Sequence, residues 1–547
     1  MPFSRPNVLW ISTHDINPHL GCYAGVWPGA EQACTPRLDA LAAEGVRFDR
    51  AFAAAPVCGP SRSAIVTGCF PPAIGTMHMR TRATPPPEVR LLSQYFREAG
   101  YWTGNTSFTD FQLEIPNPVY DVVGDHAHWR LRDDPDQPFF LAVHSLITHE
   151  SQLYLDDDEF ARRTPEARRV DEVELPPYHP DTPVYRKAWK RYLELVSQMD
   201  HWVGTILDEL EEDGLADDTI VVFWSDHGLG MPRGKRWASE LGFREPLIVR
   251  WPNRIAHGSA YDAPVGLMDL APTMLAMCGL DVPGHMHGEV VLGPDGAPRA
   301  RREEYVVSAR DRMGEQEDTS RSIRDRRYRY TRHLHPDRSP MGHCEYPDHL
   351  ATWTELRRLF SREAQQQLAF GQQPSILTDL QRSIVAASKR SAEELYDVEA
   401  DPHEEHNLAG RPEYADVRQR LSDALDGRLA ATGDLGQKPE RELLAEWQPG
   451  GQRPHCADAV VEQHGELIEA TCPTAGSIVA WTTDPPQDCV ADRQPFQGYA
   501  DDGRTWRLCT GPFTPPGPIW VKSWRIGFVP GADIPVAAPR PAVPTAP

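Results

Sequence analysis

The sequence of 547 residues has little that would place it in a membrane or on a nucleic acid. No apolar run reaches the roughly 20 residues that span a bilayer, and the N-terminus lacks a long apolar segment followed by a cleavage site. These absences predict a cytoplasmic protein without a membrane partner, or a periplasmic one if a leader has been removed. Positive charge is also scarce, since the net charge is −23, and this argues against a nucleic-acid partner.

Cysteine is sparse as well, with ten residues in the chain. The six in the first 450 residues lack the spacing of zinc ligands. The other four lie in the last hundred residues: Cys456, Cys472, Cys489 and Cys509. Reduced thiols are expected in a cytosolic chain, whereas an oxidising compartment would allow two disulfides, whose pairing the sequence does not specify.

Short apolar strands alternate with helical stretches from residue 1 to about residue 315. The predicted strands are residues 8–12, 139–145, 220–225 and 246–250. The predicted helices are residues 36–44, 61–67, 92–99, 187–212 and 269–277. This alternation predicts an α/β fold, in which helices cover both faces of a large, mainly parallel sheet.

Changes in composition predict three further units after this α/β domain of residues 1–315. Residues 316–445 combine strand-like segments with a helix at about 412–431, and form a second subdomain. Residues 450–530 are rich in Trp, Thr, Cys, Gly and Pro, with short alternating runs that predict a small all-β appendage. Residues 531–547 are rich in Pro and Ala, which predicts a disordered tail.

Polar clusters follow three of the predicted strands. They are Thr13-His14-Asp15, Thr148-His149-Glu150 and Asp226-His227-Gly228. In open α/β sheets, ligands bind at the carboxyl ends of the strands. The sequence therefore predicts that these clusters meet in one site, whereas His144, inside its strand, is expected to be a satisfied core or rim residue.

The most specific segment is Cys58-Gly59-Pro60-Ser61-Arg62-Ser63, followed by Thr67-Gly68. Pro60 suits a first helical turn and Gly68 a helix end. Cys58 then lies at a helix N-terminus, where backbone N–H groups favour an anion, and Arg62 lies one turn further on. From these residues alone, Cys58 could also be an ordinary low-pKa thiol nucleophile.

Cys-x-Pro-Ser-Arg with a trailing Thr-Gly resembles the signature of the sulfatase family, which is part of the alkaline-phosphatase superfamily. The similarity covers about residues 5–435 and favours bacterial sulfatases related to heparan N-sulfatase (sulfamidase). It extends over Leu175-Pro176-Pro177-Tyr178, Pro232–Trp237, Glu393–Asp397 and Asp401-Pro402-His403-Glu404. The resemblance implies a small C-terminal antiparallel sheet, and conversion of Cys58 to formylglycine by a maturation enzyme. A hydrated aldehyde offers one oxygen to attack sulfur and a second to expel sulfate.

The resemblance also implies the roles of the site residues. The catalytic residues are Cys58, Arg62, His149 as a general acid, and the sulfate-binding Lys235. The ligands of one divalent metal are Asp15, Asp226, His227 and converted Cys58. Substrate-binding roles are expected for Ser61, Asp110 and Arg236.

This chain departs from the family pattern at two positions. His14 replaces an acidic metal ligand, so calcium, expected from the family, competes with manganese, zinc or magnesium. His14 itself is either a ligand or a residue behind the ligands. Phe108 stands where relatives carry a lysine, so one sulfate contact is missing or comes from Arg80, Arg82 or Arg244.

Three functions remain open on this sequence. The first is hydrolysis of a sulfate ester or sulfamate on a sulfated small molecule or glycan. The second is phosphonate monoester or phosphodiester hydrolysis, which His14 favours. The third is a weakened homologue that binds carbohydrate, which Phe108 and His14 together favour. The sequence specifies neither the oligomeric state nor the role of the appendage.

Overall fold

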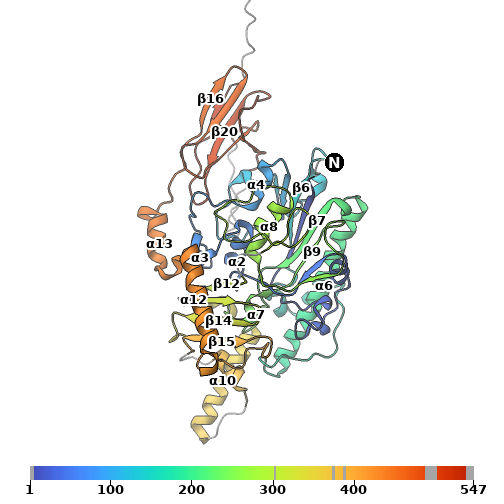
Figure 1. The fold of residues 1–547 in the computed structure, drawn as a ribbon, viewed down its shortest axis with the longest axis vertical. Helices are drawn as coiled ribbons and strands as arrows, with labels where there is room; N and C mark the ends of the chain where they lie inside the picture. Colours follow the sequence, from blue (N-terminus) through green and yellow to red (C-terminus); the bar gives the residue numbers. More distant parts are fainter. Residues whose placement is uncertain are drawn as a thin grey trace, which may run out of the picture.

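The structure is a computed structural model that describes residues 5–106, 108–300, 304–371, 376–385, 390–486 and 502–537. The molecule is elongated: the C-terminal β-strands lie at one end of the long axis and α10 (Ala351–Phe370) lies at the other (Figure 1). The α/β domain lies between them. Among the described residues, no helix is long and apolar enough to cross a membrane.

The α/β domain is built on an eight-stranded sheet with the order β10-β2-β9-β7-β1-β6-β4-β5. Its members are β1 (Asn7–Thr13), β2 (Val46–Phe48), β4 (Trp102–Asn105), β5 (Val122–Val123), β6 (Phe139–His144), β7 (Thr219–Ser225), β9 (Leu247–Arg250) and β10 (Ser259–Tyr261). The five strands from β7 to β5 are parallel, as predicted. Strand β9 runs antiparallel to both of its neighbours, a direction that the apolar run could not indicate.

Alternate residues of the central strands face two separate cores. Leu9 and Ile11 of β1 pack toward α1 (Pro36–Glu44) and α6 (Pro183–Glu212). Val8 and Trp10 pack on the other face, toward α2 (Cys58–Thr67), α4 (Leu92–Glu98) and α8 (Leu270–Met277). Both faces are therefore covered, which is why these strands read as continuous apolar runs.

Two helices begin earlier than predicted. Helix α6 starts four residues before the predicted start, because the Thr182 side chain caps it by accepting a bond from the backbone N–H of Tyr185, and Pro183 takes its first position. Helix α2 starts at Cys58, three residues early, and ends at Gly68, which adopts a left-handed conformation (φ 67°).

The remaining short elements surround this core. A three-stranded sheet contains β3 (Ala51–Phe52), β8 (Arg244–Glu245) and β11 (Val265–Gly266). The short helices include α3 (Pro71–Ile74), α5 (Asp157–Arg163), α7 (Glu240–Phe243) and α9 (Glu345–Asp348).

A four-stranded antiparallel sheet follows, with the order β12-β13-β14-β15. Its strands are β12 (Val306–Arg310), β13 (Ser320–Arg324), β14 (Tyr328–His333) and β15 (Glu393–Asp397), and α12 (Ala415–Thr432) packs on it. The predicted boundary at residue 315 falls between two strands of this sheet. Helices α10 and α11 (Asp379–Val385) instead contribute Trp353, Leu356 and Ile384 to the core beneath the large sheet.

The chain ends in a β appendage, which is reached through α13 (Glu440–Trp447). It contains the hairpin β16 (Val460–His464) and β17 (Leu467–Thr471), and a sheet of β18 (Ile478–Thr482), β19 (Arg507–Leu508), β20 (Ile519–Trp524) and β21 (Ile534–Val536). Strand β21 pairs with β20, so the predicted disordered tail is wrong at these three residues, because a neighbouring strand supplies their hydrogen bonds. Residues 538–547 of that tail lie outside the described residues.

Candidate active site

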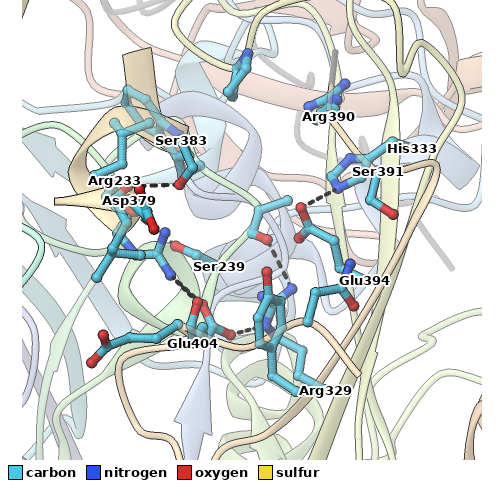
Figure 2. Close-up of a pocket in the computed structure, with 18 of the residues that line it drawn as sticks. Arg233, Ser239, Arg329, His333, Asp379, Ser383, Arg390, Ser391, Glu394 and Glu404 are labelled. Atoms are coloured by element: carbon cyan, nitrogen blue, oxygen red, sulfur yellow. Dashed lines mark hydrogen bonds and ion pairs between the residues drawn. The ribbon is translucent and has the colours of Figure 1, made fainter. Parts of the chain in front are cut away.

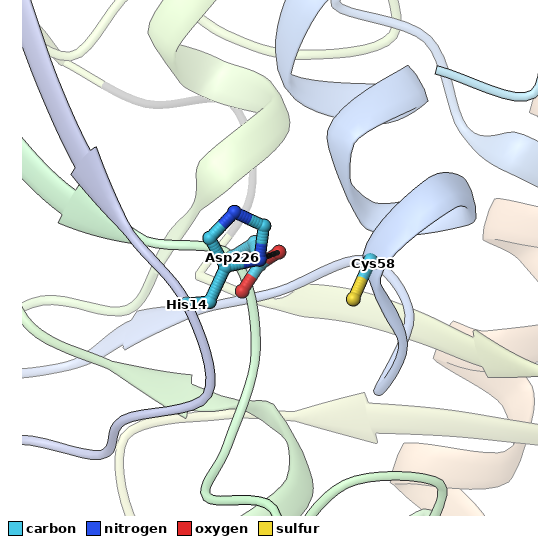
Figure 3. A group of neighbouring side chains, drawn as sticks. All are labelled: His14, Cys58 and Asp226. Atoms are coloured by element: carbon cyan, nitrogen blue, oxygen red, sulfur yellow. Dashed lines mark ion pairs between the residues drawn. The ribbon is translucent and has the colours of Figure 1, made fainter. Parts of the chain in front are cut away.

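The carboxyl ends of β1, β6 and β7 meet at one edge of the sheet, as the strand-end rule predicts. Ser12 is in register with His144 on one side and Trp224 on the other, so the segments that leave these strands start side by side. Cys58 faces them from the first turn of α2 (Figure 3). The sequence thus brings four distant segments to one place.

Three potential ligand atoms converge next to the sulfur of Cys58. Its Sγ lies 3.1 Å from Nε2 of His227. That nitrogen lies 3.4 Å from Oδ1 of Asp15 and 3.6 Å from Oδ1 of Asp226. All four side chains are buried. The residues predicted from the family as metal ligands therefore form one cluster.

The state of His227 fits a metal ligand. Its Nδ1 lies 3.0 Å from the backbone oxygen of Gly228, so the proton is expected on Nδ1 and the Nε2 lone pair points into the cluster. Burial lowers the pKa of His227, and the imidazole is neutral, as metal binding requires. Two carboxylate oxygens and one imidazole nitrogen thus fit a divalent cation.

His14 lies next to Asp226, and one nitrogen of its ring lies within 4.8 Å of the Cys58 sulfur and of an Asp226 oxygen. Its Nδ1 is 3.1 Å from Oδ2 of Asp226, and its Nε2 accepts a bond of 2.8 Å from Arg62. Burial lowers the pKa of His14 to about 3, so the ring is neutral. Both nitrogens face protein groups, which favours the second alternative from the sequence, a residue that orients a ligand.

Arg62 is fully buried inside a cage of protein groups. Its Nε donates to Oδ2 of Asp226 at 2.9 Å. The rings of Phe108 and Trp224 lie 4.7 and 5.4 Å from the guanidinium carbon. Phe108 therefore helps to hold the Arg62 guanidinium in position through a cation–π contact. The lysine expected at position 108 would instead have added a second positive charge.

His144 is a satisfied, half-buried residue at the rim of the core, as the sequence predicts. Its Nδ1 contacts Ser12 Oγ at 2.5 Å and its Nε2 contacts Asn105 Oδ1 at 2.9 Å. Burial lowers its pKa well below the usual value. The ring supports Arg62, with Nη1 of the arginine 3.4 Å from Nδ1.

Sequence reasoning placed Glu150 in a polar cluster but gave it no role. Its Oε1 lies 3.0 Å from Lys235 Nζ, and its two oxygens accept bonds of 2.9 and 2.7 Å from Arg236. Lys235 also donates to Oδ2 of Asp15 at 2.9 Å. Burial opposes the charge of Lys235, but Asp15 and Glu150 raise its pKa. Glu150 thus holds the side chains of both Lys235 and Arg236 in position.

The other predicted residues surround this centre at different depths. His149 is half-buried, and its Nδ1 lies 2.9 Å from Ser151 Oγ. Asp110 pairs with Arg80 at 3.8 Å, and burial raises its pKa. Ser61 is buried and donates to the backbone oxygen of Asp226 at 2.5 Å, so it fastens α2 to the turn that carries Asp226 and His227.

Cys58 lies in a tightly packed surrounding of its own. Its side chain packs with Met79 and Met313. Burial raises the pKa of the thiol well above its usual value. The neighbouring Gly59 leaves room for Gln112, whose Oε1 would lie 2.3 Å from an added Cβ. A buried thiol next to two carboxylates differs from the electropositive, partly exposed setting of an ordinary reactive cysteine.

Backbone conformation around the site is unusual. Asp15 (φ 54°) and Arg236 (φ 78°) have positive φ angles, which non-glycine residues rarely adopt. Such conformations persist where surrounding contacts over-determine them, and they concentrate at functional sites. The bonds of Asp15 to Lys235 and of Arg236 to Glu150 provide those contacts here.

A cavity of about 500 Å³ lies between the loop that carries Lys235 and the small antiparallel sheet. Figure 2 shows Arg233, Arg329, His333, Glu394 and Glu404 around it. In the described part of the chain, none of the predicted site residues lines this cavity. The cavity adjoins this loop, since Arg310, on its wall, donates to the backbone oxygen of Arg236 at 2.6 Å.

The fold is of the α/β class, and side chains able to hold a metal gather beside a cysteine at a helix start. The sulfatase family profile matches residues 6–280. A second profile, described as the C-terminal part of N-sulphoglucosamine sulphohydrolase, matches residues 229–339. The chain belongs to the sulfatase family, and it is a hydrolase of that family.

Individual proteins agree with this assignment. An ulvan-active sulfatase of Formosa agariphila is 31% identical across 97% of this chain and 91% of its own length. A solved structure, described as a complex with its substrate D-glucosamine-2-N,6-O-disulfate, superposes with a TM-score of 0.54 at 19% identity, over 80% of this chain and 100% of its own. The phosphonate monoester hydrolase of Agrobacterium radiobacter gives 0.55 at 17%, over 79% and 97%. The two structures show that the fold is shared.

Proposed function

We propose that this enzyme hydrolyses sulfate esters of a sulfated polysaccharide, with Cys58 converted to formylglycine. The observation that carries the proposal is the position of Cys58: it begins α2 and its Sγ lies 3.1 Å from His227 Nε2, beside Asp15 and Asp226. A maturation enzyme that oxidises Cys58 is the partner this requires. The ulvan-active relative, aligned over nearly the whole chain, supports a polysaccharide substrate.

One divalent metal is held by Asp15, Asp226 and His227 in this proposal. Such an ion would polarise a sulfate oxygen and neutralise its charge. The imidazole nitrogen favours manganese or zinc over calcium, which prefers oxygen ligands. His14 and Arg62 hold Asp226 in orientation.

The other residues bind and protonate the substrate. Lys235 and Arg236 supply positive charge on the side held by Glu150. His149 protonates the leaving oxygen from the half-buried rim of the site. Asp110, paired with Arg80, contacts the sugar. Together they provide the electrostatic complement that a developing sulfate charge needs.

Phosphonate or phosphodiester hydrolysis is the second candidate. The Asp226-His227 pair with its nitrogen donor, and the fold shared with a phosphonate monoester hydrolase, favour it. Because Phe108 stands in place of the expected lysine beside Arg62, the site also has one positive charge fewer to bind the anionic group of the substrate. The two activities differ in the atom that is attacked, sulfur or phosphorus, so parallel assays with the two kinds of ester separate them.

The test combines mass spectrometry with turnover. Purified enzyme, co-expressed with a formylglycine-generating enzyme, is digested, and the peptide containing Cys58 is expected to carry an aldehyde. Sulfate release is then measured from ulvan oligosaccharides and from 4-nitrophenyl sulfate, with bis-4-nitrophenyl phosphate in parallel. Cys58→Ala should lose all turnover, whereas Cys69→Ser, a buried cysteine just after the same helix, should keep it. Turnover by Cys58→Ala, or hydrolysis of the phosphodiester alone, would overturn the proposal.

A further inference from the structure

Two of the late cysteines lie in contact in the appendage. Cys456 precedes β16 and Cys472 directly follows β17, so they stand at the base of one hairpin. Their sulfurs are 3.8 Å apart, although 16 positions separate them in the sequence. A disulfide bond needs about 2.05 Å, a distance that small side-chain rotations can reach from such a contact.

The backbone on both sides of the pair is fixed by hydrogen bonds. The Cys456 N–H donates to the backbone oxygen of Val529 at 2.9 Å. The Ala457 N–H donates to Thr474 Oγ at 2.8 Å, which ties the Cys456 segment to the turn after Cys472. Ser523 of β20 donates to the oxygen of Ala457 at 2.6 Å. The sulfur contact is therefore a property of the folded sheet.

We propose that Cys456 and Cys472 form a disulfide that closes the base of the β16–β17 hairpin. Of the four cysteines in the last hundred residues, these two are therefore the pair that we expect to be bonded. Cys509 follows β19 and donates its N–H to Val479, on the other sheet of the appendage. Cys489 lies outside the described residues.

The chemistry requires a disulfide oxidant, such as oxidised glutathione or a thiol-oxidising protein. Cys472, the more exposed sulfur, attacks the oxidant as a thiolate, and one oxidant thiol leaves. Cys456 then attacks Cys472 in the mixed disulfide and releases the second thiol. Two protons and two electrons pass from the pair to the oxidant. Burial acts against ionisation of Cys472, but hydrogen bonds from Ser477 and Thr474 lower its pKa, which favours it as the attacking thiol.

The bond would stabilise the most exposed sheet of the molecule. Val460 and Leu467 are 48% and 45% exposed, and in this hairpin only Ile468 and Ala470 are buried. A two-stranded hairpin of this kind is marginal without support. A disulfide at its base would lower the conformational entropy of the unfolded hairpin segment. It would therefore stabilise a part of the chain whose folded state gains little from apolar packing. Recovery of the bond from the native host would also indicate an oxidising compartment, against the cytoplasmic prediction.

The test uses the full-length protein in a glutathione redox buffer. Free thiols are alkylated without reduction, and the protein is digested and analysed by mass spectrometry. We expect a cross-linked peptide pair that joins Cys456 to Cys472 and is two hydrogen atoms lighter than the reduced pair. Cys472→Ser should abolish it, and Cys509→Ser should leave it in place. The oxidised protein should also resist proteolysis between residues 456 and 472 longer than the reduced one.

Two results would overturn the proposal. One is complete alkylation of both cysteines after equilibration with excess oxidised glutathione. The other is a cross-link from either cysteine to Cys509. Cys456→Ser provides a second check, because it leaves Cys472 free to form a mixed disulfide with glutathione and so reports whether that sulfur is accessible.

Discussion

At the scale of single residues, the proposed metal site has one nitrogen ligand, Nε2 of His227. His227→Ala removes the imidazole and leaves both carboxylates with their partners, Lys235 and Arg62. Loss of a residue that only orients a ligand typically weakens metal affinity by about tenfold or more. Loss of the ligand itself should weaken it by at least as much. We expect lower bound manganese or zinc by elemental analysis after dialysis, with a circular dichroism spectrum like that of the wild type. His201→Ala, an exposed site on α6, is the control; equal metal content in both variants would remove His227 from the ligand set.

Phe108 gives a second prediction at this scale. Phe108→Leu keeps an apolar side chain but removes the ring 4.7 Å from the Arg62 guanidinium. A desolvated cation–π contact is worth about 1–2 kcal/mol, so a misplaced Arg62 should lower kcat by roughly tenfold. Phe108→Tyr keeps the ring and should retain most of the rate. A Leu variant as fast as the wild type would mean that Asp226 alone positions Arg62.

Much of this site could be predicted at the residue scale, for a specific reason. Asp15, Asp226 and His227 each follow an apolar strand, and parallel strands bring their ends together. The cage around Arg62 could not be predicted, because the directions of the Phe108 and Trp224 rings depend on tertiary packing. The pairing of Glu150 with Lys235 and Arg236 was missed for the same reason, although Glu150 stood in a recognised cluster.

At the scale of elements, helix α13 reaches the wall of the candidate site. Glu440, at its start, accepts bonds of 2.5 and 2.8 Å from Arg312. Arg312 donates to the backbone oxygen of Met79 at 2.9 Å, and the Met79 N–H donates back to Arg312. Since Met79 packs against Cys58, an element that precedes the appendage supports the cysteine at the start of α2.

Glu440→Gln tests this support. Burial acts to raise the pKa of Glu440, but hydrogen bonds from Arg312 and Thr81 lower it below its ordinary value of 4.5. A depressed pKa gives stability that is present above about pH 4.5 and lost as the pH falls through the folded-state pKa. Wild type should therefore be more stable than Glu440→Gln by about 1–2 kcal/mol at pH 7, and the difference should shrink below pH 4.5.

Urea unfolding at pH 7 and pH 4 measures this difference. Glu442→Gln, exposed on the same helix, is the matched control and should show no such pH dependence. A stability gap between wild type and Glu440→Gln that stays constant down to pH 4 would show that the carboxylate charge is not what holds Arg312.

The strands themselves illustrate what a pattern can and cannot specify. Strand β1 was predicted to within a residue at each end, because apolar runs buried on both faces are unambiguous. The direction of β9 was not, since an apolar run of four residues reads the same in either orientation. The predicted start of α6 was four residues late, because Thr182 caps the helix and Pro183 takes its first position.

At the scale of the whole molecule, the appendage is docked on the α/β domain. Ile478 and Ile526 pack with Leu91, Phe111 and Leu113, the last two near Asp110. Arg97 of α4 donates to the backbone oxygens of Pro118, in the α/β domain, and Trp506, which directly precedes β19 in the appendage. Composition predicted the appendage as a separate β unit but could not predict this docking, because the contacts are apolar residues scattered over two distant parts of the chain.

Net charge acts over the whole molecule as well. A charge of −23 repels a polyanionic glycan, although the site itself carries Arg62, Lys235 and Arg236. Raising the ionic strength from about 0.01 to 0.15 M shortens the screening length from about 30 to 8 Å, which weakens the repulsion more than contacts inside the site. We expect kcat/KM for sulfated polysaccharide to rise severalfold over this range, mainly through KM. The rate with 4-nitrophenyl sulfate, a monoanion, should change much less. A fall in kcat/KM for the polymer would instead mean that local cations steer the substrate, and that the acidic surface lies away from its path.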